Sequence, residues 1–306
     1  MQDYGSSRFQ MITKVFFMPP TLRICRPLFA AALLLGTPSL AEQPTATPAQ
    51  RIISLSPALT KQLYLLEAGA SVVGITSYCP QPENAPPVER VGSVVDPSLE
   101  RILQLKPDLV VSTPLASRKR MSSLESLGIK VVEFPPALSF SHIGEQFLQL
   151  GALAGKRELA QRIIREARAQ AQAVAAATAD RQPKPRVFIQ IGVKPLATAG
   201  PDSFINDLIE MAGGVNIVAD STFRVYSREA VLAANPDCIL IATMGLGGES
   251  EIAQWKRYEI LSAAARDRIF MVDADRICSP TPLDFVQTLR EVTAMLYPDA
   301  HTAEQP

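Results

Sequence analysis

Residues 98–111 read SLERILQLKPDLVV and residues 227–240 read SREAVLAANPDCIL, so one fourteen-residue unit occurs twice, 129 positions apart. Five positions are identical: Ser98/Ser227, Glu100/Glu229, Leu103/Leu232, Pro107/Pro236 and Asp108/Asp237. In each copy a short amphipathic helix ends at the Pro-Asp pair and is followed by an apolar strand. Such units recur by chance in α/β proteins, but chance does not predict a glutamate at the same point of both helices. The repeat therefore predicts two lobes of like construction.

The two shared glutamates lie near the starts of their helices. In the first copy we expect Asp96 to cap the helix and Pro97 to take its first position, and in the second copy we expect Ser227 to be the cap. An acid in the first turn complements the helix dipole by about 0.3–1 kcal/mol, and both glutamates could serve that purpose alone. The alternative is that each lobe presents one carboxylate, Glu100 or Glu229, to the arginines of a two-fold partner.

Strand-like and helical runs alternate along the chain from residue 51. Strands separated by helices of this length form βαβ units and a mainly parallel sheet. Residues 155–180 are rich in Ala, Arg, Glu and Gln, with no internal Gly or Pro, which favours one long helix between the two halves. The expected fold class is α/β, with two lobes that are each a mainly parallel sheet flanked by helices and joined by this helix. The expected strands are 52–55, 72–75, 109–112, 130–134, 186–191, 238–242 and 268–272, and the other expected helices are 61–69, 120–128, 202–213 and 282–296.

The N-terminal residues have the pattern of a cleavable secretory signal. Arg23 and Arg26 precede an apolar run at 28–35, and the small-residue site at 39–41 predicts cleavage after Ala41. The run is far shorter than the ~20 residues of a membrane-spanning helix. Cys25 precedes the run, so a lipid-modified cysteine is not expected, and the mature chain is expected in the periplasm. The predicted organisation is signal peptide 1–41, flexible leader 42–50, N-terminal lobe 51–154, connecting helix 155–181, C-terminal lobe 182–300 and tail 301–306.

Composition excludes several function classes. Removing residues 1–41 leaves a chain about three charges negative, without the clustered positive charge of nucleic-acid binders. The chain has two histidines, His142 and His301, so neither a Ser-His-Asp arrangement nor a multi-histidine zinc or manganese site is supported. The glycine-rich run at 245–248 departs from the dinucleotide pattern at Ser250. We therefore expect no enzymatic activity, no resident metal or cofactor, and a monomer.

The chain resembles the helical-backbone class of periplasmic substrate-binding proteins of ABC importers, the group that handles vitamin B12, haem and ferric siderophores. The resemblance covers about 51–297. It implies a bilobal fold, a ligand in the cleft between the lobes, and one surface glutamate per lobe that docks onto arginines of the membrane permease. Glu100 and Glu229 match those docking positions. The motifs that carry the resemblance are RIISLSP (51–57), VGI (73–75), SLERI (98–102), KPDLV (106–110), GIKV (128–131), GGVNI (213–217) and SRE (227–229).

Within this class the chain is most similar to the vitamin B12-binding branch, through Ser77-Tyr78 before a proline-rich loop, IQIG (189–192) and Asn216-Ile217. The resemblance implies that Tyr78 and Phe223 are ligand-facing aromatics. Val94 and Ala197 stand where that branch tends to carry aromatics, so two flat surfaces expected against a corrin ring are missing. The implied transport ligand is cobalamin or another corrinoid. A haem or ferric-siderophore receptor is the alternative, and an exported scaffold or enzyme of this fold is a remoter one.

The candidate ligand-binding residues lie in three loops, 76–82, 220–226 and 273–282, because loops at the carboxyl ends of parallel strands form binding sites. Tyr78 and Phe223 could offer aromatic faces to a macrocycle, unless they only pack their own loops. Arg224 and Arg276 could meet acidic groups of a ligand. Cys79 and Cys278 belong to facing loops of different lobes in this arrangement. They could form a disulfide, bind a soft metal centre, or do neither.

Overall fold

The computed structural model describes residues 48–220, 225–243 and 247–298, all within one compact unit. The predicted signal peptide, Phe223, Arg224 and the tail 301–306 lie outside these ranges. None of the helices in the described ranges is long and apolar enough to cross a membrane.

The N-terminal lobe contains a sheet of five parallel strands in the order β3-β2-β1-β4-β5. The central strands are buried along their whole length, as expected for a parallel sheet covered on both faces. The strands are β1 (Ile52–Ser54), β2 (Val72–Ile75), β3 (Glu89–Arg90), β4 (Leu109–Ser112) and β5 (Lys130–Glu133), and their connections contain α1 (Pro57–Leu65), the 3-10 helix η1 (Gly69–Ser71), α2 (Leu99–Gln104) and α3 (Arg118–Ser126).

The C-terminal lobe contains four parallel strands in the order β7-β6-β8-β9. The expected α/β class with one parallel sheet in each lobe is thereby confirmed. The strands are β6 (Arg186–Gln190), β7 (Val215–Asn216), β8 (Cys238–Ile241) and β9 (Ile269–Met271), and the helices are α6 (Phe204–Met211), α7 (Arg228–Ala234), α8 (Gly248–Lys256), α9 (Ser262–Ala265), α10 (Ala274–Cys278) and α11 (Pro282–Leu296).

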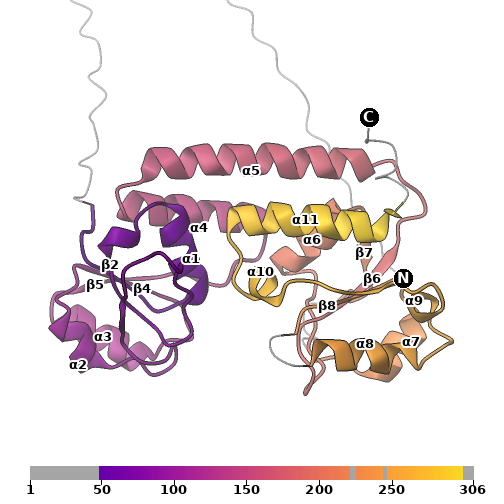
Figure 1. Cartoon of the computed structure of the whole chain (residues 1–306), viewed down its shortest axis with the longest axis horizontal. Coiled ribbons are helices and arrows are strands. Elements are labelled where there is room, and N and C mark those ends of the chain that lie inside the picture. The colour runs from indigo at the N-terminus through magenta and orange to yellow at the C-terminus, as the bar shows by residue number, and fades with distance from the viewer. Residues whose placement is uncertain (1–47, 221–224, 244–246, 299–306) are drawn as a thin grey trace, which may run out of the picture. The chain divides into compact units, whose positions relative to one another are not determined.

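Two helices, rather than the single one expected, span both hydrophobic cores. In α5 (Arg157–Thr178), Ile163 and Ile164 pack into the core of the N-terminal lobe, while Ala167 and Ala171 pack into that of the C-terminal lobe. The preceding helix α4 (Phe140–Leu153) does the same in the opposite order along its sequence. Figure 1 shows α5 lying along α4 and α11, and all three helices contact one another. The lobes are therefore joined by packed helices and not by a flexible linker.

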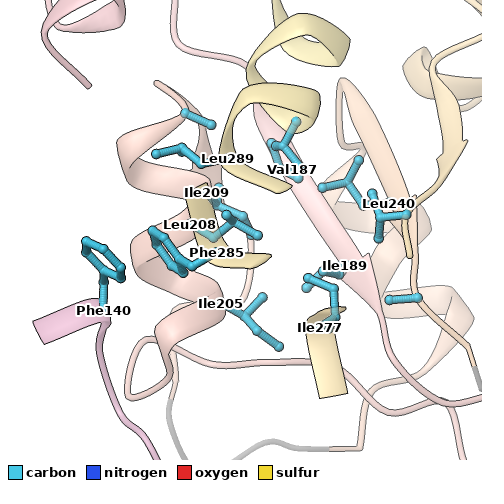
Figure 2. Close-up of a cluster of buried hydrophobic side chains, with 14 of the residues drawn as sticks. Phe140, Val187, Ile189, Ile205, Leu208, Ile209, Leu240, Ile277, Phe285 and Leu289 are labelled. Carbon is cyan, nitrogen blue, oxygen red and sulfur yellow. The ribbon is translucent and has the colours of Figure 1, made fainter. Parts of the chain in front are cut away.

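The first side chain of α4 packs into the core of the C-terminal lobe. Phe140, the first residue of α4, stacks on Phe285 of α11 with 4.2 Å between ring centroids and 13° between planes. Figure 2 shows this pair at the edge of a cluster that also contains Ile205 and Leu208 of α6 and Ile189 of β6. The backbone N–H of Phe140 donates to the carboxylate of Asp207 on α6 at 2.8 Å. The start of α4 is thus fixed to the C-terminal lobe.

The first repeat helix begins later than the sequence predicts. Its N-cap is Ser98, whose hydroxyl accepts a hydrogen bond from the N–H of Arg101 at 3.3 Å. Pro97 lies outside the helix because it forms an isolated bridge with Gly92, and because the N–H of Ser98 donates to the carbonyl of Val91 at 2.7 Å. The expected roles of Asp96 as cap and of Pro97 as first residue are wrong. Both repeat helices are therefore capped by the shared serine, since Ser227 accepts from Ala230 at 3.1 Å.

Candidate functional site

Large apolar side chains are exposed in the loops that follow three strands of the N-terminal lobe, β2, β3 and β4. Tyr78 follows β2 and is 76% exposed, Val95 follows β3 and is 64% exposed, and Leu115 follows β4 and is 69% exposed. The carboxyl ends of parallel strands lie at one edge of the sheet, so these side chains share that edge. Exposed apolar side chains at this edge make it a candidate binding surface. Val95 and Leu115 were not predicted, although their positions shortly after strands were a usable signal.

The turn that carries Tyr78 is held by hydrogen bonds on both sides. Arg90, in β3, donates from Nη1 to the carbonyl of Thr76 at 2.7 Å and to the carbonyl of Cys79 at 2.8 Å. The backbone N–H and the hydroxyl of Ser77 both donate to the carbonyl of Gly92, at 2.8 and 3.1 Å. Tyr78 is therefore presented to solvent on a turn that these hydrogen bonds hold in place. Arg90 was missed because nothing in the local sequence distinguishes it from a solvated strand-edge arginine.

The two predicted loop cysteines occupy different environments. Cys79 is buried in the core of the N-terminal lobe, with its Sγ 3.0 Å from Thr76 Oγ1 and 3.9 Å from the carbonyl of Ser54. This burial does not suit direct contact with a ligand. Cys278 is exposed at the end of α10, where partial desolvation and the charge of Asp275 raise its thiol pKa. Both thiols are free, so the disulfide considered from the sequence is absent.

Arg276 lies on α10, where the sequence predicted a loop, and its guanidinium already has two acidic partners. Its Nε is 3.1 Å from Asp273 and its Nη1 is 2.7 Å from Glu291 of α11. Although burial alone would lower it, these two carboxylates raise the pKa of Arg276. Asp273 is also the N-cap of α10 and accepts from the N–H groups of Asp275 and Arg276. Arg276 therefore fixes α10 onto α11, and its guanidinium is already paired.

In the C-terminal lobe, the loops after β6 and β7 are joined at the carboxyl edge of the sheet. Ala197 and Val225 form an isolated antiparallel bridge, and the N–H of Tyr226 donates to the carbonyl of Leu196 at 2.9 Å. Val225 is an exposed apolar residue at this edge. The predicted Phe223 and Arg224 come just before it, in the segment outside the described residues.

An ion-pair cluster connects the two lobes. Lys61 of α1 places Nζ 2.7 Å from Asp275 and 2.9 Å from Asp284 of the C-terminal lobe. The side-chain amide of Gln62 donates to the carbonyl of Pro280 at 3.2 Å. A pocket of about 420 Å³ adjoins the cluster and draws its walls from both lobes. It is lined by Lys61, Tyr64, Leu65, Pro80, Gln81, Pro82, Thr281, Leu283 and Asp284, and thus by the residues that directly follow Tyr78 and Cys79.

The paired glutamates occupy equivalent, exposed positions. Glu100 and Glu229 are each the second residue of a serine-capped helix, α2 or α7. Hydrogen bonds from its own backbone N–H and from the Ser227 hydroxyl lower the pKa of Glu229, so this carboxylate is charged at neutral pH. The two lobes thus present one carboxylate each from matching local structures.

Comparison with known proteins agrees with this architecture. Residues 52–276 match the periplasmic binding protein family. The chain is 31% identical over 265 residues to a vitamin B12-binding protein of Vibrio cholerae, covering 85% of this chain and 94% of that protein. The crystal structure of the periplasmic vitamin B12-binding protein of Vibrio cholerae superposes with a TM-score of 0.69 at 29% identity, covering 83% of this chain and 99% of that one.

A haem-binding member shares the fold at lower identity. The periplasmic haem-binding protein from Pseudomonas aeruginosa superposes with a TM-score of 0.71 at 23% identity, covering 82% of this chain and 94% of that one. This likeness concerns the fold alone. The chain belongs to the periplasmic binding protein family, the extracytoplasmic substrate-binding proteins of ABC transporters, which are transport proteins and not enzymes.

Proposed function

We propose that this protein captures cobalamin or another corrinoid between its two lobes and delivers it to an ABC permease. The observation that carries the proposal is the apolar carboxyl edge of the N-terminal lobe, where Tyr78, Val95 and Leu115 are exposed and the turn at Tyr78 is braced by Arg90. A macrocycle is bound by burial of apolar and aromatic surface with a few polar contacts. The vitamin B12-binding relatives support the choice of ligand.

The proposed ligand contacts differ in kind. Tyr78 supplies an aromatic face from the N-terminal lobe, and Phe223 and Arg224 are proposed to complete the site from the C-terminal lobe. Cys79 and Arg276 act indirectly, since the first packs beneath the Tyr78 turn and the second is paired with Asp273 and Glu291. Cys278 is an exposed thiol next to the interlobe contacts and is not in a disulfide with Cys79, so it is free to contact a ligand.

Haem is the second candidate ligand. The apolar edge offers one described aromatic residue, Tyr78, and a flat porphyrin could stack on it as a corrin ring could. The shared fold of the Pseudomonas aeruginosa haem-binding protein is consistent with this alternative.

Ligand choice is tested by titrating the mature chain, residues 42–306, with cyanocobalamin, haemin and a ferric hydroxamate siderophore, using calorimetry and visible absorbance. We expect saturable one-to-one binding of cobalamin and about tenfold weaker binding by Tyr78→Ala, because a stacked aromatic contributes on the order of 1 kcal/mol beyond its buried area. Ile260→Ala, at another exposed apolar position, is the control and should bind normally. Tight binding of haemin with none of cobalamin would select the alternative. Binding of none of the three would contradict the proposed ligand class.

The docking role proposed for Glu100 and Glu229 has its own test. Each carboxylate is proposed to meet an arginine of the permease dimer in a charge-assisted contact. The double variant Glu100→Lys/Glu229→Lys should bind ligand as the wild type does but lose uptake in cells that carry the permease. The control is Glu158→Lys/Glu166→Lys, which makes the same charge change at exposed positions of α5. Normal uptake by the Glu100/Glu229 variant would contradict the docking role.

A further inference from the structure

An arginine directly precedes Glu229 in the sequence, and its charge would repel the permease arginines that Glu229 is proposed to meet. In the structure, the Arg228 side chain is turned away from solvent and packs against α8. Its side chain is only 18% exposed. Its Nη2 donates to the carboxylate of Glu251 and, at 3.0 Å, to Oε1 of Gln254, and its guanidinium lies 4.5 Å above the ring centre of Trp255. All three partners belong to α8, which lies beside α7 (Figure 1).

Glu251 is the charged partner that makes this position of Arg228 favourable. The carboxylate of Glu251 is 5% exposed and also accepts a hydrogen bond from Nε2 of Gln190 at 2.9 Å. Oε1 of Gln190 in turn accepts from the indole N–H of Trp255 at 2.7 Å. A buried carboxylate requires a paired cation, and a buried guanidinium requires a paired anion. Each of Arg228 and Glu251 therefore holds the other inside the C-terminal lobe.

In the N-terminal lobe, the arginine next to the docking glutamate is exposed. Arg101 follows Glu100 and is 56% exposed, and its Nη1 is 3.8 Å from the equally exposed carboxylate of Glu89. It also donates to the carbonyl of Arg90 at 2.8 Å. A pair of this kind is solvated and weak. The buried arrangement is therefore particular to the lobe that carries Glu229.

We propose that Glu251 is a positioning residue for permease docking, which withdraws Arg228 so that Glu229 meets the permease without a competing cation. The inference rests on the proposed docking role of Glu229. Glu251 is buried and cannot itself contact the permease, so its effect on docking would be exerted through Arg228.

The test measures binding of ligand-loaded receptor to the purified permease complex in nanodiscs at low and moderate salt. Glu251→Gln should release Arg228 and weaken docking about tenfold, the effect of one unfavourable charge at an interface, with the larger loss at low salt. Ligand affinity should not change. Glu249→Gln, which removes an exposed charge on the same helix, should dock as the wild type does. Emission of Trp255, the sole tryptophan of the chain, should shift in Glu251→Gln, because the guanidinium leaves its ring.

A double variant separates positioning from folding. Arg228→Gln/Glu251→Gln removes both buried charges together and leaves no cation to release, so it should dock within about twofold of the wild type. If Glu251 only stabilises the lobe, the folded fraction of Glu251→Gln should already dock as the wild type does, and the double variant then has no docking loss to recover. Docking severalfold tighter than wild type would mean that Arg228 already opposed the permease, and would overturn the inference. So would wild-type docking by a folded Glu251→Gln.

A third variant distinguishes failure of the inference from failure of the docking role. If Glu229→Lys docks normally, the proposed docking role itself is wrong, and the inference that rests on it falls with it. If Glu229→Lys abolishes docking while Glu251→Gln behaves like Glu249→Gln, only the inference is wrong.

Discussion

Asp108 and Asp237, the shared aspartates of the repeat, each hold the first residues of a neighbouring strand. The Asp108 carboxylate accepts from the backbone N–H of Gln50 at 2.8 Å and of Arg51 at 3.2 Å, immediately before β1. The Asp237 carboxylate accepts from the N–H of Arg186 at 3.0 Å, at the start of β6. The repeat thus encodes a fixed junction between two parallel strands, in addition to a helix.

Replacing either aspartate should destabilise its lobe. We expect Asp108→Ala and Asp237→Ala to lower the free energy of unfolding by about 1–3 kcal/mol each, because hydrogen bonds to a charged acceptor are lost at the end of a central strand. Asp202→Ala, at an exposed turn position, is the control and should change it by less than about 0.5 kcal/mol. Urea denaturation followed by circular dichroism measures the difference. Equal stability of all three variants would contradict the strand-holding role.

At the scale of elements, the contact between α4 and α5 depends on a glycine. A Cβ built on Gly151 would lie 2.5 Å from the Cβ of Ala160, a separation that real side chains do not adopt. At Gly144, seven residues earlier on the same helix, the nearest atoms are the flexible end of Arg168 at 3.3 Å and Ile164 Cδ1 at 3.4 Å. Of these two glycines, only Gly151 is therefore required for the close approach of α4 and α5.

These two glycines should respond in opposite directions to the same substitution. Gly151→Ala should lower the free energy of unfolding by about 1–3 kcal/mol. The clash of the added methyl group with Ala160 outweighs the roughly 1 kcal/mol that alanine contributes through its higher helix propensity. Gly144→Ala should be neutral or stabilising by up to about 1 kcal/mol. Thermal unfolding compares them. Adding Ala160→Gly to Gly151→Ala should recover part of the loss, and a Gly151→Ala variant more stable than wild type would contradict the packing argument.

At the scale of the whole molecule, Lys61 joins the lobes through Asp275 and Asp284. Burial alone would lower its pKa, but the two carboxylates raise it above the ordinary value of 10.5. The contacts of Lys61 with the two aspartates therefore stabilise the chain at neutral pH. This stabilisation is lost as the pH rises through the folded-state pKa of Lys61, which lies above 10.5.

Removing this lysine should weaken the connection between the lobes. We expect Lys61→Met to lower the free energy of unfolding by about 1–2 kcal/mol at pH 7, since Lys61 is largely buried while Asp275 is exposed. Lys256→Met, which removes an exposed pair with Asp267, should cost less than about 0.5 kcal/mol. The difference between wild type and Lys61→Met should shrink above pH 10.5, as measured by denaturation across that range. A difference that grows with pH would contradict the ion-pair assignment.

The sequence by itself determined the two-lobed α/β class, the equivalence of Glu100 and Glu229, and helices such as α11, whose observed bounds Pro282–Leu296 are those predicted. These features follow from local signals: periodicity, caps and Pro-Asp stops. Strands β3 and β7 are two residues long, too short for any periodic signal. Helix α4 was missed because its glycines lower helix propensity, and the need for one of them arises only in packing against α5.

Only the tertiary structure decided which polar side chains are free. Cys79 and Arg276 were predicted to contact the ligand, but Cys79 is directed into the core and Arg276 is held by Glu291. Arg228, next to the predicted docking residue Glu229, is held by Glu251. Their partners come from other elements, and charge pairing depends on distance and burial rather than on sequence spacing. The exposure of Val95 and Leu115 also depends on tertiary structure, because a position shortly after a strand does not by itself say whether the side chain is covered.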